Sequence, residues 1–281
     1  MRMRMRMRMR GASTRLSAGT ERRLGSAARS TGAQLPTKRP GRGCRLATSR
    51  AAAVLFDVGN TLAHIDYAFV AACLRAHGCQ ATPDVVGRTD ALVRRHGWSA
   101  APGAGAATPR PPRDGFFATY IGALCDRLGL DEAAGQAVAA EVARAHRSRP
   151  LGLWDQVDPD AARVLQTLTA AGLRLGVVSN ADGRVETQLL RLGLRPYFRV
   201  VIDSAHAGVA KPDPRIFTLA LQALGTAADQ TTYVGDIVAV DVHGAEGAGL
   251  HGLLYDRWNV WPDASVPRII HLHELPAWVL G

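Results

Sequence analysis

The stretch VLFDVGNTLAHID, residues 54–66, carries the most informative pattern in the chain. An apolar run leads into Asp57, a Gly-Asn-Thr turn follows, and a segment of helical character comes after the turn. Short runs that are almost wholly apolar are typical of strands buried on both faces, as in a parallel sheet. The stretch therefore predicts a buried strand that ends at Asp57.

Similar apolar runs recur along the chain, and amphipathic helical patterns separate them. The candidate strands are 52–58, 173–180, 199–204, 231–236 and 251–256. Helical periods at 159–171 and 213–224 lie between them, and the second begins with Asp213 as a cap and Pro214 in its first turn. This alternation predicts an α/β fold with a doubly wound, Rossmann-like parallel sheet.

One long interval interrupts the alternation. About 115 residues separate the first two strands, which is too long for a simple crossover connection. Helical periods occupy 67–77, 116–128 and 131–146 of this interval, and the Ala-, Gly- and Pro-rich segment 99–115 is predicted to be a loop. We therefore expect a core formed by 51–65 and 150–281 and an inserted α-helical cap over 66–149.

The formal charge of +10 is unevenly distributed along the chain. Residues 1–50, which begin MRMRMRMRMR, hold fourteen Lys and Arg residues and one acid, Glu21. The remaining 231 residues carry a formal charge of −3. Such a mildly acidic body gives no evidence of a nucleic-acid surface, so no nucleic-acid partner is expected for it.

The Arg-rich segment 1–50 has no apolar period that would bury a face, so it is predicted to be a disordered tail. Three interpretations of it stay open: an extension upstream of the functional reading frame, an organellar transit peptide, and a polybasic contact arm. The chain has no run of eighteen apolar residues, so no membrane span is expected. Cysteines without a CxxC pair favour reduced thiols in a cytoplasmic protein: Cys44, Cys73, Cys79 and Cys125.

Polar side chains stand at or just after the ends of several predicted strands. Because open α/β folds bind ligands at the carboxyl edge of the sheet, these side chains are candidates for one site. They are Asp57, Ser179, Asn180, Lys211, Asp236 and Asp241. Carboxylates from separate strands, a hydroxyl and a lysine would suit a phosphate group and a Mg²⁺ ion.

Four motifs in this order give the chain a family resemblance: FDVGNT, VVSN, KPDPRIF and YVGDIVAVD. The chain resembles hydrolases of the haloacid dehalogenase superfamily that have a helical cap between the first and second motifs. The resemblance covers roughly residues 52–275. It implies a phosphatase that acts on a small phosphomonoester through an aspartyl-phosphate intermediate.

The resemblance also implies a role for each motif residue. Asp57 would be the nucleophile and a Mg²⁺ ligand, with the Gly59 carbonyl and Asp236 as further ligands and Asp241 in support. Ser179 and Asn180 would bind phosphate oxygens, and Lys211 would neutralise charge between nucleophile and phosphate.

Gly59 departs from the family pattern, because the family's phosphatases usually have a second Asp at that position. The missing carboxylate would protonate the leaving alcohol, a contribution of about 10²–10⁴ in rate. His64 is a candidate replacement acid or base, and a hinge residue is the alternative. A second hypothesis is therefore a weakly catalytic or non-catalytic relative that binds a phosphorylated ligand or a protein partner.

Other chemistries agree less well with the sequence. An actin-like ATPase would need another Asp-x-Gly loop in a suitable place later in the chain. Dehalogenases lack the acid aligned with Asp236, which this chain has. Phosphonate hydrolases need a lysine in the cap, and 66–149 contain none. Basic and aromatic residues near the cap loop are candidates for binding an anionic or aromatic substrate, and a solvated helix face is the favoured alternative: Arg94, Arg95, His96, Trp98 and Arg113. Neither the substrate nor the oligomeric state follows from the pattern.

Overall fold

A parallel sheet of six strands forms the centre of the structure, a computed structural model that describes residues 51–97, 116–263 and 265–281. All described residues fall within one compact unit, Gly43–Gly281. The strand order is β5-β4-β1-β6-β7-β8, and every pairing is parallel. The strands are β1 (Ala53–Phe56), β4 (Arg174–Ser179), β5 (Val200–Asp203), β6 (Thr231–Gly235), β7 (His251–Tyr255) and β8 (Arg268–Ile269). The five predicted strands are confirmed, and β8 was not predicted.

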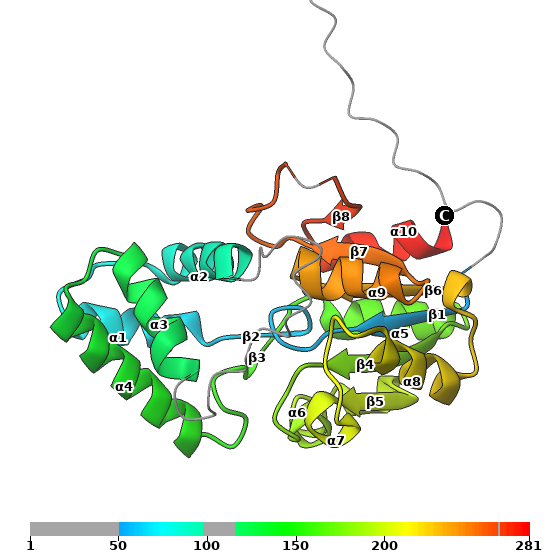
Figure 1. Ribbon diagram of the computed structural model, residues 1–281, viewed down its shortest axis with the longest axis horizontal. Helices are drawn as coiled ribbons and strands as arrows, with labels where there is room; N and C mark the ends of the chain where they lie inside the picture. The colour runs from blue at the N-terminus through cyan, green and yellow to red at the C-terminus, as the bar shows by residue number, and fades with distance from the viewer. Residues whose placement is uncertain (1–50, 98–115, 264) are drawn as a thin grey trace, which may run out of the picture. The chain divides into compact units, whose positions relative to one another are not determined.

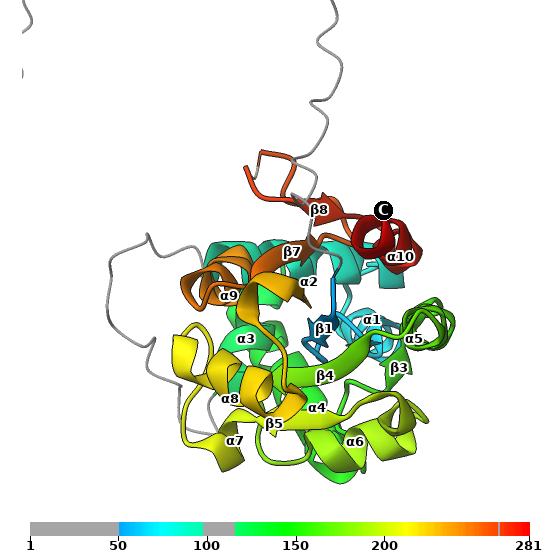
Figure 2. The same ribbon diagram turned by 90° about the vertical axis from the view of Figure 1, so that its right-hand side faces the viewer.

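Helices cover both faces of this sheet, which confirms the doubly wound fold. Figure 2 shows α5 and α10 on one side and α8 and α9 on the other. Val54 and Phe56 of β1 face the first layer, whereas Ala53 and Leu55 face the second. The core helices are α5 (Ala161–Ala170), α6 (Val185–Arg191), α7 (Ser204–Ala207), α8 (Pro214–Leu224), α9 (His243–Gly247) and α10 (Leu275–Leu280).

Helix ends in the structure follow the capping residues of the sequence. Asp213 accepts a hydrogen bond from the Arg215 amide at the start of α8, with Pro214 in the first turn. Asp66 accepts one from the Phe69 amide at the start of α1. These caps fix where each helix begins.

Among the described residues between β2 and β3, four helices form a hydrophobic cluster of their own; we call α1–α4 the cap (Figure 1). They are α1 (Tyr67–Ala76), α2 (Pro83–Gly97), α3 (Phe116–Arg127) and α4 (Glu132–Ser148). The antiparallel pair β2 (Ala63–His64) and β3 (Gln156–Val157) joins them to the core. The inserted helical cap is thus confirmed, while the segments 1–50 and 99–115 lie outside the described residues.

Helix α2 docks on the core segment 256–263. Trp258 reaches so close to the helix that a Cβ atom on Gly87 would lie 2.2 Å from the Trp258 ring. Arg88 donates a hydrogen bond to the Trp258 carbonyl at 2.7 Å, and Arg95 forms an ion pair with Asp263 at 2.8 Å. The expected solvated helix face is therefore wrong for Arg95, which holds the cap to the core.

The linker that leads from α4 back to β3 folds around His146. The Leu153 amide donates a hydrogen bond to His146 Nδ1 at 3.1 Å, and the Arg184 guanidinium lies 3.3 Å from Nε2. Burial, and then the charge of Arg184, lower the pKa of His146 to about 4.

The cysteines in the described part of the chain, Cys73, Cys79 and Cys125, are free thiols. Across 51–97, 116–263 and 265–281, no helix is long and apolar enough to span a bilayer.

Replacing Gly87 by Ala should reduce the free energy of unfolding by about 1–3 kcal/mol, because the new methyl group overlaps the Trp258 ring. Gly122 in α3 is the matched control, since a Cβ there meets nothing within 4 Å in the described part of the chain. Its replacement by Ala should stabilise the protein by about 0.5–1 kcal/mol. Urea unfolding measures both, and a neutral Gly87→Ala would contradict the interlocking of α2 with Trp258.

The stability of the protein should fall as the pH drops from about 6.5 to about 4. The unfolded chain protonates His146 below its ordinary pKa, whereas the folded chain keeps the ring neutral until the lowered pKa is reached. His146→Gln should therefore make the plot of unfolding free energy against pH shallower in this window. Identical slopes for the two proteins would show that burial of His146 does not hold it neutral.

Candidate active site

Asp57 stands directly after β1, where two groups bind the same carboxylate oxygen. Ser179 at the end of β4 donates its hydroxyl to Asp57 Oδ1 at 2.8 Å, and Lys211 Nζ lies 3.1 Å from that oxygen. Burial raises the pKa of the Asp57 carboxyl, although the charge of Lys211 acts in the opposite direction. Three side chains predicted from strand ends thus meet at one edge of the sheet.

Lys211 is held from three directions. Besides Asp57, its ammonium donates to Asp241 Oδ1 and to the Tyr233 hydroxyl, both at 2.7 Å. Tyr233 in turn donates its own proton to the Val178 carbonyl at 2.8 Å. Burial disfavours the charge on Lys211, but Asp241 and Asp57 outweigh this effect and raise the pKa of the ammonium. The lysine is therefore charged, with all three protons directed at protein oxygens.

Asp241 reaches the site through a wide π-helical turn, Val238–Val242, that follows β6. Its Oδ2 accepts the backbone amides of Asp236 at 3.1 Å and Ile237 at 2.9 Å. Gly235 permits this approach, since a Cβ there would lie 2.4 Å from Asp241 Cγ. Both carboxylate oxygens are thus engaged by protein donors, and the supporting role of Asp241 stays a prediction.

The carboxylates of Asp57, Asp236 and Asp241 are close enough to share a cation. One oxygen from each lies within 4.8 Å of the others. With Lys211 and Arg94 as the neighbouring cations, these three acids leave a net formal charge of −1. An oxygen-rich, negatively charged cluster fits a hard divalent ion such as Mg²⁺. The Gly59 carbonyl stays a predicted further ligand.

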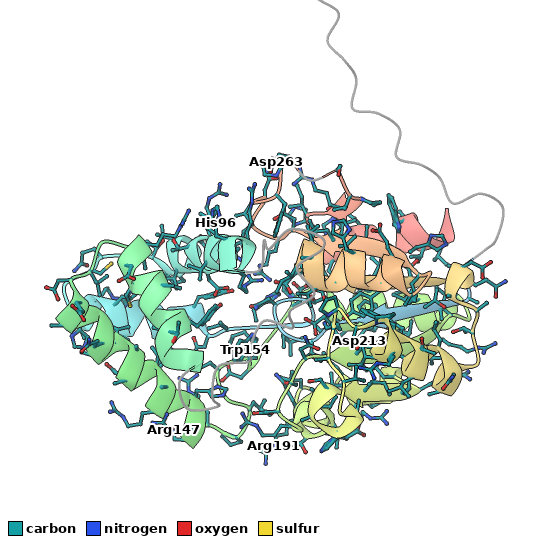
Figure 3. All side chains as sticks on the ribbon, in the orientation of Figure 1. His96, Arg147, Trp154, Arg191, Asp213 and Asp263 are labelled. Atoms are coloured by element: carbon teal, nitrogen blue, oxygen red, sulfur yellow. The ribbon has the colours of Figure 1, made fainter. Side chains whose placement is uncertain are left out.

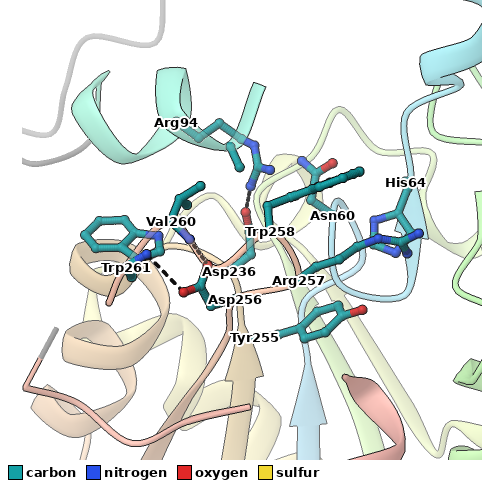
Figure 4. A pocket seen from close by; sticks show the side chains of 11 residues that line it. Asn60, His64, Arg94, Asp236, Tyr255, Asp256, Arg257, Trp258, Val260 and Trp261 are labelled. Carbon is teal, nitrogen blue, oxygen red and sulfur yellow. Dashed lines mark hydrogen bonds and ion pairs between the residues drawn. The ribbon is translucent and has the colours of Figure 1, made fainter. Parts of the chain in front are cut away.

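Arg94 enters this cluster from the cap; it was expected to bind substrate or to lie on a solvated helix face, and its pairing with a core carboxylate was not predicted. It lies on α2, is only 9% exposed, and pairs with Asp236 of the core and with Asp90 one turn earlier on its own helix. Figure 4 shows Arg94 directed at Asp236. The expected solvated face is therefore wrong for Arg94 as well.

A pocket lies between α2 and the core beside Asp236 (Figure 4). Its lining combines charged and aromatic side chains from the cap and from the core. They include Asn60, His64, Arg94, Tyr255, Arg257 and Trp258. Asp236 and these side chains therefore line the same pocket.

His64 lines this pocket but is tied to another carboxylate. Its Nε2 lies 2.9 Å from Asp158, which also accepts hydrogen bonds from Tyr255 at 2.7 Å and Arg257 at 3.0 Å. Burial lowers the pKa of His64 despite the hydrogen bond to Asp158. The imidazole is thus neutral at pH 7, and its acid–base role stays a prediction.

Asn180 binds the backbone of the lysine loop in this structure. Its amide donates to the Lys211 carbonyl at 2.9 Å and accepts the Lys211 amide at 2.8 Å. This arrangement positions Lys211, so a contact of Asn180 with phosphate stays a prediction. Asp203, the acid at the end of β5, accepts the amides of Ala205 and Gly183 at 2.9 Å each, as expected for a turn-capping residue.

Gly59, where a carboxylate is missing, faces the indole of Trp154. A Cβ on Gly59 would lie 3.4 Å from Trp154 Nε1, which is ordinary contact. Trp154, labelled in Figure 3, belongs to the linker between α4 and β3. An indole from this linker therefore borders the space where the second acid would stand.

Comparison with known proteins relates this geometry to a family. A model of the family described as haloacid dehalogenase-like hydrolase matches residues 51–249. The haloacid dehalogenase-like hydrolase domain-containing protein 3 of Danio rerio is 40% identical over 128 residues, which are 44% of this chain and 52% of that protein. A phosphoserine phosphatase of Thermus thermophilus is 32% identical over 150 residues, 50% of this chain and 58% of that one. The chain spans about half the length of these curated relatives.

Solved structures share the fold. YfnB from Bacillus subtilis, in a magnesium-bound crystal, has a TM-score of 0.57 and 21% identity over 82% of this chain and 99% of that one. A HAD phosphatase from Thermococcus onnurineus has a TM-score of 0.50 and 22% identity over 80% of this chain and 96% of that one.

Replacing Tyr233 by Phe should lower the free energy of unfolding by about 1–3 kcal/mol, because a buried charge loses an acceptor and the Val178 carbonyl loses a donor. The control is Tyr197→Phe, whose hydroxyl has no hydrogen-bond partner within the described part of the chain. That change should stay within about 0.5 kcal/mol. Equal effects in urea unfolding would show that the Tyr233 hydroxyl does not support Lys211.

Proposed function

The chain belongs to the haloacid dehalogenase-like hydrolase family, and from this premise we propose that it is a Mg²⁺-dependent phosphatase acting on a small phosphomonoester. One observation carries the proposal: Asp57, Ser179, Lys211 and Asp236 gather at the carboxyl edge of one parallel sheet. The names of two relatives also support it, the phosphoserine phosphatase of Thermus thermophilus and the glyceraldehyde 3-phosphate phosphatase of Methanopyrus kandleri. In this proposal 51–65 and 150–281 form the core, and 66–149 form the cap.

Asp57 is the proposed nucleophile. Its free carboxylate oxygen attacks phosphorus, the bond from phosphorus to the leaving alcohol breaks, and the phosphoryl group rests on Asp57. A water molecule then attacks phosphorus, the acyl phosphate bond breaks, and inorganic phosphate leaves with the Asp57 carboxylate restored. A bound Mg²⁺, held by Asp57, Asp236 and the Gly59 carbonyl, would neutralise phosphoryl oxygens during both displacements.

Ser179 and Lys211 prepare Asp57 for this attack. Both contact Oδ1, so they fix the rotation of the carboxylate and leave Oδ2 as the oxygen that can face phosphorus. The ammonium also offsets the charge that builds up as two anions approach each other. Because its three protons are directed at protein oxygens, Lys211 acts here through its field and its hold on Asp57.

Gly59 limits the chemistry that this site can promote. The leaving alkoxide must take its proton from water or from the substrate itself, because a neutral His64 could serve as a base but not as an acid. Loss of a positioned acid costs about 10²–10⁴ in rate, or roughly 3–5 kcal/mol in the barrier. Esters with good leaving groups should therefore be preferred. The same residue supports the second candidate, a relative that binds a phosphorylated ligand and turns it over slowly or not at all.

Replacing Asp57 by Asn should reduce turnover of phosphate esters at saturating Mg²⁺ by at least about a thousand-fold, because the nucleophile is lost. Asp203→Asn is the matched control: this strand-end acid accepts backbone amides only, and its loss should leave turnover nearly unchanged. A panel that includes p-nitrophenyl phosphate and aliphatic esters measures both variants. Full activity of Asp57→Asn would exclude the aspartyl-phosphate route.

The variant Gly59→Asp separates the two candidate functions. Turnover by the wild type, raised further by Gly59→Asp, supports an enzyme that works without the acid. Turnover that occurs only in Gly59→Asp supports the binding protein, and a Mg²⁺-dependent beryllofluoride complex of the inactive wild type would agree with it.

A further inference from the structure

The contact between Arg94 and Asp236 joins the cap to the proposed metal site. Asp236 is a core carboxylate and Arg94 a cap guanidinium, and both are buried. Asp90 pairs with Arg94 from within α2, with its Oδ2 3.1 Å from Arg94 NH2. Tyr67 donates its hydroxyl to that same oxygen at 2.8 Å and so fixes Asp90. The guanidinium is therefore held rigidly from the cap side.

The docking of α2 determines where this guanidinium lies. Arg88 and Arg95 of the same helix bind the core segment 256–263, and Trp258 inserts at Gly87. Tyr67 packs edge-on against the same Trp258 ring, with 5.9 Å between centroids. When α2 sits on the core in this way, Arg94 is brought against Asp236.

A divalent cation would need the same carboxylate. Asp57 and Asp241 already have Lys211 as a counter-ion, whereas Asp236 has Arg94. Mg²⁺ binds its oxygen ligands at about 2.0–2.1 Å and tolerates little distortion, so a guanidinium in direct contact with the carboxylate obstructs it. If the ion pair between Arg94 and Asp236 breaks, Arg94 still has the ion pair with Asp90, which partly compensates the charge of the guanidinium.

We propose that Arg94 competes with the divalent cation for Asp236, so that metal binding and the docking of α2 on the core oppose each other. Without metal, Arg94 neutralises Asp236 and adds an ion pair between cap and core. With metal, that ion pair is lost and α2 is held only by its remaining contacts. The inference rests on the metal site of the proposed function, and it assigns Arg94 a role in metal binding.

Calorimetric titration with MgCl₂ tests the competition directly. Arg94→Met should bind Mg²⁺ at least about five-fold more tightly than the wild type, as expected for a typical coupling between two sites. Arg127→Met removes the same charge from an exposed position on α3 and should leave the affinity unchanged, which controls for the net charge. Equal or weaker binding by Arg94→Met would overturn the proposal.

A measurement on the wild type keeps the proposal testable if Arg94→Met does not fold. Because coupling is reciprocal, Mg²⁺ should speed hydrogen exchange of the α2 amides relative to those of α4. Exchange of α2 that is unchanged or slowed by Mg²⁺ would overturn it. Tight Mg²⁺ binding with no dependence on Arg94 would refute only this inference, whereas absence of binding in both proteins would also refute the metal site of the proposed function.

Discussion

The buried ammonium of Lys211 is the interaction on which the site depends. It contacts Asp57 after β1, Asp241 in the turn after β6 and the hydroxyl of Tyr233 within β6. Carboxylates buried this close together would repel each other and lose their hydration, a cost of several kcal/mol per ion unless opposite charge lies beside them. One lysine therefore lets two acids from separate elements share one edge of the sheet. Asn180 fixes the loop that carries it, so the second motif supports the third.

Arg94 provides the same kind of compensation for Asp236, but from the cap. The two cations differ in an important respect, because Lys211 belongs to the rigid core and Arg94 depends on where α2 docks. The charge beside Asp236 therefore depends on the position of the cap: the three acids with Lys211 and Arg94 carry a net formal charge of −1, and without Arg94 they carry −2. An anionic substrate and a cation meet different fields in these two situations.

Much of the site followed from the sequence, because local patterns determine it. A run such as VLFD predicts a buried strand, and parallel strands bring their carboxyl ends to one edge, so Asp57, Ser179 and Asp236 could be grouped without coordinates. Arg94 could not, since 142 positions separate it from Asp236 and their contact depends on the fit between Gly87 and Trp258. The helical periods identified in the cap, 67–77, 116–128 and 131–146, do not include Arg94, and a solvated helix face was expected for it because a charged residue on a helix usually faces solvent. The hydroxyl of Tyr233 was missed for a related reason, because its aromatic ring fits an apolar strand equally well.

The number of buried charges at this site helps to interpret the absence of an acid at position 59. Replacing a buried ion pair with well-packed apolar residues is often neutral or stabilising, so folding alone does not require Lys211, Asp57, Asp236 and Asp241 together. Their arrangement is better explained by a ligand that carries charge of both signs, such as a phosphate with a divalent cation. In the proposed function, the acid missing at Gly59 would act in a different step, the departure of the alcohol, and its absence leaves the arrangement of these charges intact. Under that proposal the site would still bind and attack phosphorus, and the leaving group of the substrate would determine the rate of turnover.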